Sequence, residues 1–294
     1  MKTRMTPGRL TFTVFNYLFL GALSLMCILP MIHILALSFS SGSAAAAGKV
    51  TLWPVEFTTV AYQNIMSKPQ YFTAFLVTLK RVALGTSISM LLTVLAAYPL
   101  SKETSHFKFR TVYAWYFVIT ILFGGGLIPW YMTIKATGLM DTIWALVLPG
   151  AVPVFNVILL LNFYRGLPKE LEESAKIDGA NHFVTLFKIY LPLSTPALAT
   201  IGLFTIVGHW NSWFDGLILM NRPENYPLQT FLQTIIIKKD FRFISSEELD
   251  ILRQLSDRTS TAAQIFVAAF PILIVYPFLQ RFFIKGIVMG SVKE

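Results

Sequence analysis

The chain has 294 residues, of which 55% are hydrophobic and 13% are charged, against about 25% charged in an average soluble domain. Its mean hydropathy of +0.62 and 25 phenylalanines exceed what a soluble core absorbs, so the composition predicts a polytopic membrane protein. The net charge of +9 comes largely from basic residues that flank apolar runs, which indicates membrane topology rather than a nucleic-acid partner. A single cysteine, Cys27, excludes an intrachain disulfide, and the four scattered histidines show no metal-ligand spacing.

Six apolar runs are long enough to cross a bilayer, since one helical span takes about 20 residues. We therefore expect an all-α protein with six transmembrane helices at residues 11–38, 72–100, 111–132, 143–163, 193–220 and 261–284. The first run could also be a cleaved signal peptide, but it is much longer than the roughly 7–15 residues of a signal core, which favours an uncleaved helix. We divide the chain into residues 1–70, with the first helix and an external loop, and a core, residues 71–294, with the other five spans.

The distribution of basic residues predicts which side of the membrane each loop faces. Six spans place both termini on one side, together with the loops 101–110 and 164–192. These four segments hold 13 Lys or Arg, whereas the opposite loops hold nine, six of them balanced by six acids in the loop 221–260. The positive-inside rule then predicts that the N-terminus, the C-terminus and the segment 164–192 are cytoplasmic.

A polar segment, Leu167–Pro192, lies between the fourth and fifth expected spans. Pro168 suits the first position of a helix, and three glutamates follow near the positive end of that helix. Asp178-Gly179 predicts a turn, and a second short helix is expected over residues 181–189. The result is a helix–turn–helix hairpin, which on these residues alone is either a docking element or an ordinary amphipathic connection.

The spacing within this segment resembles the EAA loop of permeases in binding-protein-dependent ABC importers. The usual motif is E-A-A, three residues, G, nine residues and I-x-L-P, and the matching positions are Glu173, Ser174, Ala175, Gly179, Ile189, Leu191 and Pro192. Ser174 is the one departure, because the family has alanine there. The extended form, with Glu172 and Ile177-Asp178-Gly179-Ala180, is similar to the carbohydrate-uptake branch that includes the smaller permease of the maltose importer.

Three further stretches resemble the same branch: Gly125–Pro129, Trp210–Phe214 and Lys285–Lys293. The first and third look like the subgroup that handles alginate and aldouronate oligosaccharides. The resemblance implies a type I ABC importer permease fold and a pore subunit for sugars, in particular oligosaccharides that include acidic ones. It also implies that the hairpin is a coupling helix, whose residues would be Glu172, Glu173, Ser174, Ala175, Asp178, Gly179 and Ala180.

The partners that the resemblance implies are a second homologous permease subunit, two copies of an ABC ATPase, an extracytoplasmic solute-binding protein and the lipid bilayer. The chain has no G-x-x-x-x-G-K-[ST] phosphate loop. It is therefore expected to bind no cofactor itself and to be no enzyme, with ATP and Mg used by the partner ATPase.

Ionisable groups at membrane depth are candidates for function. Lys80 and Arg81 interrupt the second apolar run. They either line the pore, where they would attract an acidic or hydroxyl-rich sugar, or extend to the outer headgroups. Gly124–Gly126 and Pro129, in the third run, mark either a helix break that lines a cavity or close helix packing.

A second candidate set lies late in the fifth run, toward the outer side: Trp210, Asn211, Trp213 and Asp215. Aromatic, amide and carboxylate groups suit sugar binding, but two tryptophans three residues apart on one helix face also suit an interfacial aromatic belt. Asp215 is the only acid in the expected spans, and no H-E-x-x-H motif occurs. These facts disfavour the two alternative functions, a membrane-embedded enzyme and an ion-coupled secondary transporter.

Overall fold

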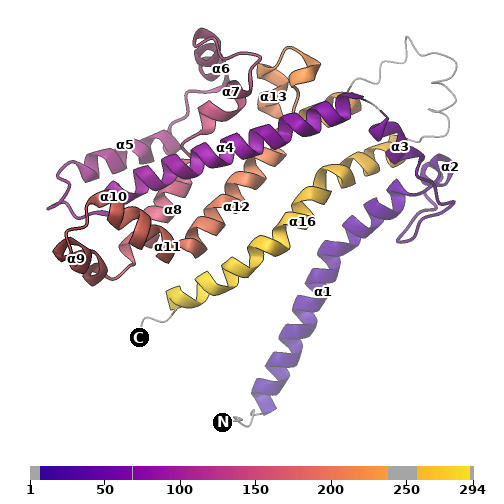
Figure 1. Ribbon diagram of the computed structural model, residues 1–294. Helices are drawn as coiled ribbons and strands as arrows, with labels where there is room; N and C mark the ends of the chain where they lie inside the picture. The colour runs from indigo at the N-terminus through magenta and orange to yellow at the C-terminus, as the bar shows by residue number, and fades with distance from the viewer. Residues whose placement is uncertain (1–6, 68, 238–256, 292–294) are drawn as a thin grey trace. The chain divides into compact units, whose positions relative to one another are not determined.

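The structure is a computed structural model that describes residues 7–67, 69–237 and 257–291, and these residues form helices and turns without a β-strand (Figure 1). The chain divides into two compact units, Met1–Lys68 with Lys238–Phe270 and Pro69–Ile237 with Pro271–Glu294. Each unit is described by itself. The helix α16 (Asp257–Ser291) contributes residues to both.

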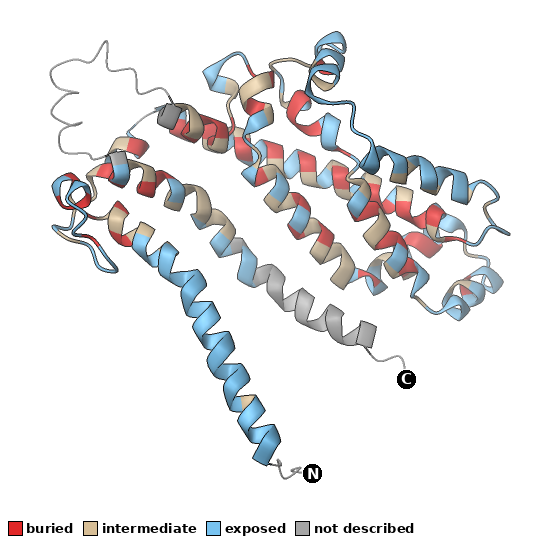
Figure 2. Cartoon of the chain, turned by 180° about the vertical axis from the view of Figure 1, so that it is seen from behind, coloured by how far each residue is buried: buried red, intermediate tan, exposed pale blue. Residues whose placement is uncertain are grey.

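The first unit begins with one long apolar helix. Its helices are α1 (Pro7–Ser38), α2 (Gly42–Ala46) and α3 (Val60–Met66). After α1 the chain turns back, and the turn is closed by a 2.7 Å hydrogen bond between the Ser38 and Tyr62 hydroxyls. Only Ala36 and Ser38 of α1 are buried, and the rest of the helix is exposed or half-buried (Figure 2). So much open apolar surface suits lipid or another protein chain.

The second unit is built around the long helix α4 (Pro69–Ser101), and α8 (Val154–Arg165) and α12 (Thr195–Asn211) lie alongside it (Figure 1). The buried residues of α4 recur every three or four positions, which places them on one face of the helix. They include Ala74, Thr78, Arg81, Gly85, Ser89, Thr93 and Ala97. The core continues at the C-terminal end of α4, where Tyr98 and Leu100 pack with Leu160 and Tyr164 of α8.

Three of the expected spans contain a break, and the break in the third lies at the glycines where the sequence left a helix break open. Between α5 (Arg110–Leu122) and α6 (Leu127–Ala136) the chain bends by 114°. A Cβ at Gly124 or Gly126 would meet nothing within 4 Å, and Gly126 has φ +84°. These glycines therefore serve a helix break rather than close packing within this chain. The fifth expected span also breaks, because α12 ends at Asn211 and α13 (Phe214–Leu219) follows.

A third bend, of 45°, divides the fourth expected span. The helix α7 (Ile143–Val147) passes into a 3₁₀ turn, η1 (Leu148–Gly150), before α8 begins. Pro149 and Pro153 lie at this bend and cannot donate backbone hydrogen bonds. The remaining elements of the unit are η3 (Pro223–Asn225) and α14 (Leu228–Ile237).

Among the described residues, two helices are individually long and apolar enough to span a bilayer, and up to five spans result if each bent pair counts as one. The sixth expected span, residues 261–284, falls within α16, whose part Arg258–Ile274 is apolar. The count of six stays a prediction. Residues 238–256 of the expected external loop 221–260 lie outside the described residues.

The helices α4 and α12 approach closely at Gly85. A Cβ at this position would lie 2.4 Å from Nε2 of His209 on α12, well inside contact distance. We expect Gly85→Ala to destabilise the protein by about 1–3 kcal/mol through overpacking. The measurement is the melting temperature of the purified protein in detergent.

The control is Gly202→Ala on α12, where the added Cβ would meet only the Met90 sulfur at 4.0 Å. His209→Ala, combined with Gly85→Ala, should recover most of the lost stability because it removes the clashing ring. A Gly85→Ala protein as stable as Gly202→Ala would contradict the close approach.

Candidate functional site

The predicted hairpin is present as a helix–turn–helix unit. The helix α9 (Lys169–Ile177) ends in a Schellman motif, in which the Ala180 and Gly179 amides donate to the carbonyls of Ala175 (2.9 Å) and Lys176 (3.0 Å). Gly179 has φ +79°, a conformation that favours glycine. Pro168 precedes the helix instead of occupying its first position, so that detail of the prediction is off by one residue.

The second arm of the hairpin is longer than the expected 181–189. It comprises α10 (His182–Thr185), a π-helical turn η2 (Leu186–Tyr190) and α11 (Leu191–Leu193). Asn181 begins it, because its side-chain oxygen accepts a hydrogen bond of 2.9 Å from the Val184 amide. An 82° bend then leads into α12. The hairpin thus has a fixed geometry at each turn.

An ion-pair cluster joins the hairpin to the end of α4. Glu172 receives Lys102 Nζ at 2.8 Å and the Tyr190 hydroxyl at 2.7 Å on one carboxylate oxygen. Lys176 Nζ lies 3.1 Å from the other oxygen. The Lys102 ammonium also lies 3.9 Å from the ring centroid of Tyr98 and 4.2 Å from that of Tyr190. We call these five residues the anchor cluster.

The charge of Glu172 is fixed by its surroundings. Burial alone would raise the pKa of this carboxyl, but the hydrogen bonds from Lys102, Tyr190 and Lys176 outweigh burial and lower the pKa to about 2. The carboxyl is therefore ionised at neutral pH. A depressed pKa contributes stability above the ordinary pKa of 4.5, and this contribution is lost as the pH falls toward 2.

The structure separates the two acids of the motif. Glu172, expected to meet basic groups of a partner, has a side chain only 16% exposed and is paired within this chain. Glu173 is exposed, as are Ser174, Asp178 and Gly179, while Ala175 is buried and Ala180 is half-buried.

Two apolar side chains stand on the hairpin beside these residues: Ile177 is 87% exposed and Phe183 is 68% exposed. The sequence placed these residues on apolar faces of the hairpin helices, Ile177 also within the motif, but neither was assigned to a binding surface. Exposed apolar side chains next to charged ones are typical of a protein-binding surface.

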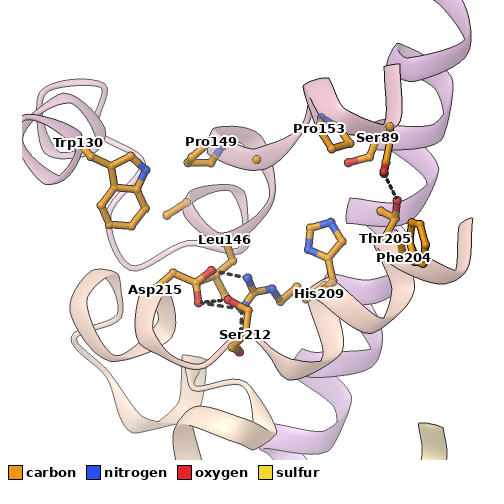
Figure 3. A pocket seen from close by; sticks show the side chains of 15 residues that line it. Ser89, Trp130, Leu146, Pro149, Pro153, Phe204, Thr205, His209, Ser212 and Asp215 are labelled. Carbon is orange, nitrogen blue, oxygen red and sulfur yellow. Dashed lines mark hydrogen bonds and ion pairs between the residues drawn. The ribbon is translucent and has the colours of Figure 1, made fainter. Parts of the chain in front are cut away.

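A cavity of about 460 Å³ lies in the second unit (Figure 3). Residues from α4, α6, α8, α12 and the turns between the short helices surround it. Its lining is Arg81, Ser89, Trp130, Ala145, Leu146, Pro149, Gly150, Pro153, Asn156, Phe204, Thr205, Gly208, His209, Ser212 and Asp215. Of the candidate pathway residues, only Arg81 and Asp215 belong to this lining.

Arg81 and Asp215 form a bidentate ion pair at one end of the cavity. Nη1 of Arg81 donates to Oδ1 of Asp215 at 3.1 Å, Nη2 contacts Oδ2, and Nη1 also faces the Ser212 carbonyl at 3.4 Å. Asp215 Oδ1 further accepts from the Ser212 hydroxyl and the Gly216 amide, each at 2.8 Å. These bonds hold the chain where α12 stops. Arg81 is 3% exposed, whereas the neighbouring Lys80 is exposed, so the two cations do not share one environment.

Some buried polar groups of the cavity have no partner among the described residues. They are the Ser89 hydroxyl and Nε of Arg81, on residues that are 1% and 3% exposed. By contrast, Asn156 donates to the Thr205 hydroxyl at 3.2 Å. Unsatisfied buried donors beside a cavity indicate a place where water or a ligand completes the hydrogen bonds.

The tryptophans do not share a face, which corrects the expectation of one helical stripe. Trp210 is 5% exposed and meets Phe75 edge-on, with ring centroids 6.2 Å apart. Trp213 is 37% exposed and meets Phe214. The helix ends between them at Asn211, which is itself exposed. The sequence did not predict this helix break, because the hydrogen bonds that fix the chain after Asn211 come from Asp215 and from Arg81, which is distant in sequence.

Comparison with known proteins identifies the class. Residues 89–288 match the family described as the inner membrane component of binding-protein-dependent transport systems. The chain belongs to this family. It is therefore a membrane-embedded transport permease subunit with the type I importer fold, and not an enzyme.

Two relatives from Bacillus subtilis (strain 168) align over nearly their whole length. The chain is 40% identical to the polygalacturonan/rhamnogalacturonan transport system permease protein YtcP over 96% of this chain and 98% of that protein. It is 39% identical to the protein LplC, and the alignment covers 98% of this chain and 97% of LplC. A crystal structure of a bacterial ABC transporter involved in the import of the acidic polysaccharide alginate matches with a TM-score of 0.84 and 31% identity, covering 96% of this chain and 100% of that one.

The Arg81–Asp215 pair gives a test by charge removal. Asp215→Asn leaves the buried guanidinium without a counter-charge, so we expect a loss of about 3–5 kcal/mol in stability and a lower melting temperature. Arg81→Met in the same chain removes that unpaired charge and should restore part of the loss. Lys80→Met, at the exposed neighbour, should change stability by less than about 0.5 kcal/mol. Equal melting temperatures for Asp215→Asn and Lys80→Met would show that the pair is not stabilising.

Proposed function

We propose that this chain is a pore subunit of an ATP-driven sugar importer and that its hairpin, residues 167–192, is the coupling element. The observation that carries this proposal is the combination of an exposed acidic and apolar edge with the anchor cluster behind it. Glu173, Ser174, Asp178, Gly179 and Ala180 would meet a groove of a separate ABC ATPase. Glu172 and Ala175 would hold the edge in position from within the chain.

The anchor cluster explains how a push on the hairpin would reach the pore. Lys102 directly follows α4, and Arg81 stands 21 positions earlier, near the middle of that helix, a distance of roughly 30 Å at 1.5 Å per residue. A continuous helix moves as one body over that length. Closure of two ATPase subunits on ATP and Mg would therefore displace the part of α4 around Arg81 and the cavity beside it.

The remaining partners follow from the same arrangement. The exposed face of α1 offers a surface to lipid and to a second, homologous permease subunit. The hairpin would face the cytoplasm together with both termini, and the opposite loops would face an extracytoplasmic solute-binding protein. Residues 71–294 would form the transport core, with residues 1–70 as its first helix and external loop.

We infer that the transported substrate is an oligosaccharide of the acidic class. Two proteins named above, YtcP and the alginate importer, carry acidic polysaccharide substrates in their names. In this chain the Ser89 hydroxyl and Arg81 Nε offer unused donors to hydroxyl or carboxylate oxygens, and Trp130 and Phe204 offer apolar faces to a sugar ring. Lys80, Trp210, Asn211 and Trp213 do not line this cavity and would act at most on the approach to it.

The coupling role is tested by charge reversal at the exposed acid. Glu173→Lys should weaken attachment of the ATPase, so less ATPase co-purifies and substrate-stimulated ATP hydrolysis falls. Glu224→Lys, an exposed acid of η3 far from the hairpin in sequence, is the matched control for attachment and should leave the amount of co-purified ATPase unchanged. Full co-purification and full stimulation in Glu173→Lys would refute docking through this edge.

The substrate contact is tested at Ser89. Loss of one hydrogen bond to substrate is worth about 0.5–1.5 kcal/mol, so Ser89→Ala should raise the KM for uptake of a uronic-acid oligosaccharide about two- to tenfold. Thr93→Val is the control, because Thr93 is also buried on α4 with an unpartnered hydroxyl but does not line the cavity. Equal uptake by Ser89→Ala and wild type would place the substrate elsewhere.

A further inference from the structure

A second cavity, of about 410 Å³, lies where α4 ends and the hairpin begins. The end of α4, the loop that follows it and the hairpin supply its walls. The lining is Leu95, Tyr98, Pro99, Lys102, His106, Phe107, Lys176, His182, Phe183 and Leu186. All these residues belong to the second unit. None of them lines the substrate cavity, while Tyr98, Lys102 and Lys176 also belong to the anchor cluster and Phe183 to the exposed surface of the hairpin.

The polarity of this second cavity changes along α4. Leu95 and Pro99 are spaced at i and i+4, so they lie along one face of α4, and Lys102 follows directly after the helix ends. The apolar wall therefore runs about 10 Å from the cationic end toward the middle of α4. Leu95 is 39% exposed, which leaves that apolar end open at the helix surface. An amphiphile, with one anionic end and one apolar end, matches this gradient better than a small soluble anion.

The cationic end has more positive than negative charge. Lys102 and Lys176 share the single carboxylate of Glu172, so one positive charge is left unbalanced within the anchor cluster. The Lys176 side chain is 39% exposed and can turn toward an anion at the mouth. His106 and His182, both exposed, add ring nitrogens beside it. Ammonium and imidazole N–H groups bind phosphate oxygens strongly because the hydrogen bonds are charge-assisted.

We propose that this cavity binds an anionic phospholipid, with the phosphate at Lys102, Lys176, His106 and His182 and the first acyl methylenes along Leu95 and Pro99. Basic pockets at the cytoplasmic ends of membrane helices suit acidic headgroups. This inference rests on the cytoplasmic placement of the hairpin proposed above. A bound headgroup would bridge the hairpin and α4 beside the anchor cluster, and so make coupling between ATPase and pore depend on the lipid.

The test uses the complete importer, purified with its ATPase and delipidated in detergent. Phosphatidylglycerol or phosphatidylcholine is added, and native mass spectrometry counts the lipids that each complex retains. Wild type should retain phosphatidylglycerol about fivefold better, the factor expected for one unbalanced cation beside an anionic headgroup. His106→Glu places a carboxylate in the cavity and should abolish this preference while the ATPase still co-purifies.

The control is Lys108→Glu, which reverses an exposed charge in the same loop but outside the cavity lining. The Lys108→Glu complex should still retain phosphatidylglycerol better than phosphatidylcholine. Equal loss in Lys108→Glu and His106→Glu, or no preference in wild type, would overturn the proposal. Glycerol 1-phosphate is the second probe: if it displaces the lipid at millimolar concentration, the site recognises a soluble phosphate and the lipid assignment fails. Undiminished co-purification of the ATPase in Glu173→Lys would instead refute the coupling role, so the two failures are distinguishable.

Discussion

The ion pair between Lys102 and Glu172 decides how the hairpin relates to the membrane core. A polar connection between two spans has no need to be rigid, yet this one is fastened to the end of α4 by the Lys102 ammonium, which meets Glu172 and the Tyr190 ring, and by the Tyr98 ring, which packs edge-on against Tyr190. The pair is half-enclosed, so removing one partner would leave a charge in a place where water reaches it poorly. The hairpin is therefore part of the helical core rather than a loop attached to it.

The helix α4 gains its importance from what holds it at two places. Lys102 and the anchor cluster hold its C-terminal end, and Arg81, in its ion pair with Asp215, holds it near the middle. Between them the helix is unbroken, whereas three other expected spans bend at glycines, prolines or a side-chain cap. The unit thus combines one unbroken helix with several helices that are interrupted by bends. Movement at the hairpin would be carried by α4 and absorbed by changes of angle at the bends around the cavity.

The sequence predicted the features that local patterns control. The turn at Gly179, the hairpin arms and the long apolar helix before Ser38 are all confirmed, since each depends on neighbouring residues. The missed features depend on residues far apart in the chain. Arg81 and Asp215 are 134 positions apart, and Lys102 and Glu172 are 70 apart. No periodicity reveals such a pair, so Arg81 was grouped with Lys80, and the break after Asn211 went unseen.

The two adjacent acids of the motif illustrate why the same residue type can have two uses. Neighbouring positions on an α-helix point about 100° apart, because 3.6 residues make one turn. On α9 this turns Glu172 inward to the anchor cluster and Glu173 outward to solvent. An inward acid fixes the angle of the helix, and the outward acid is then presented at a defined place. In the proposed coupling, a flexible hairpin would lose part of an ATPase-driven displacement to its own bending, whereas a fastened one would pass the displacement to α4.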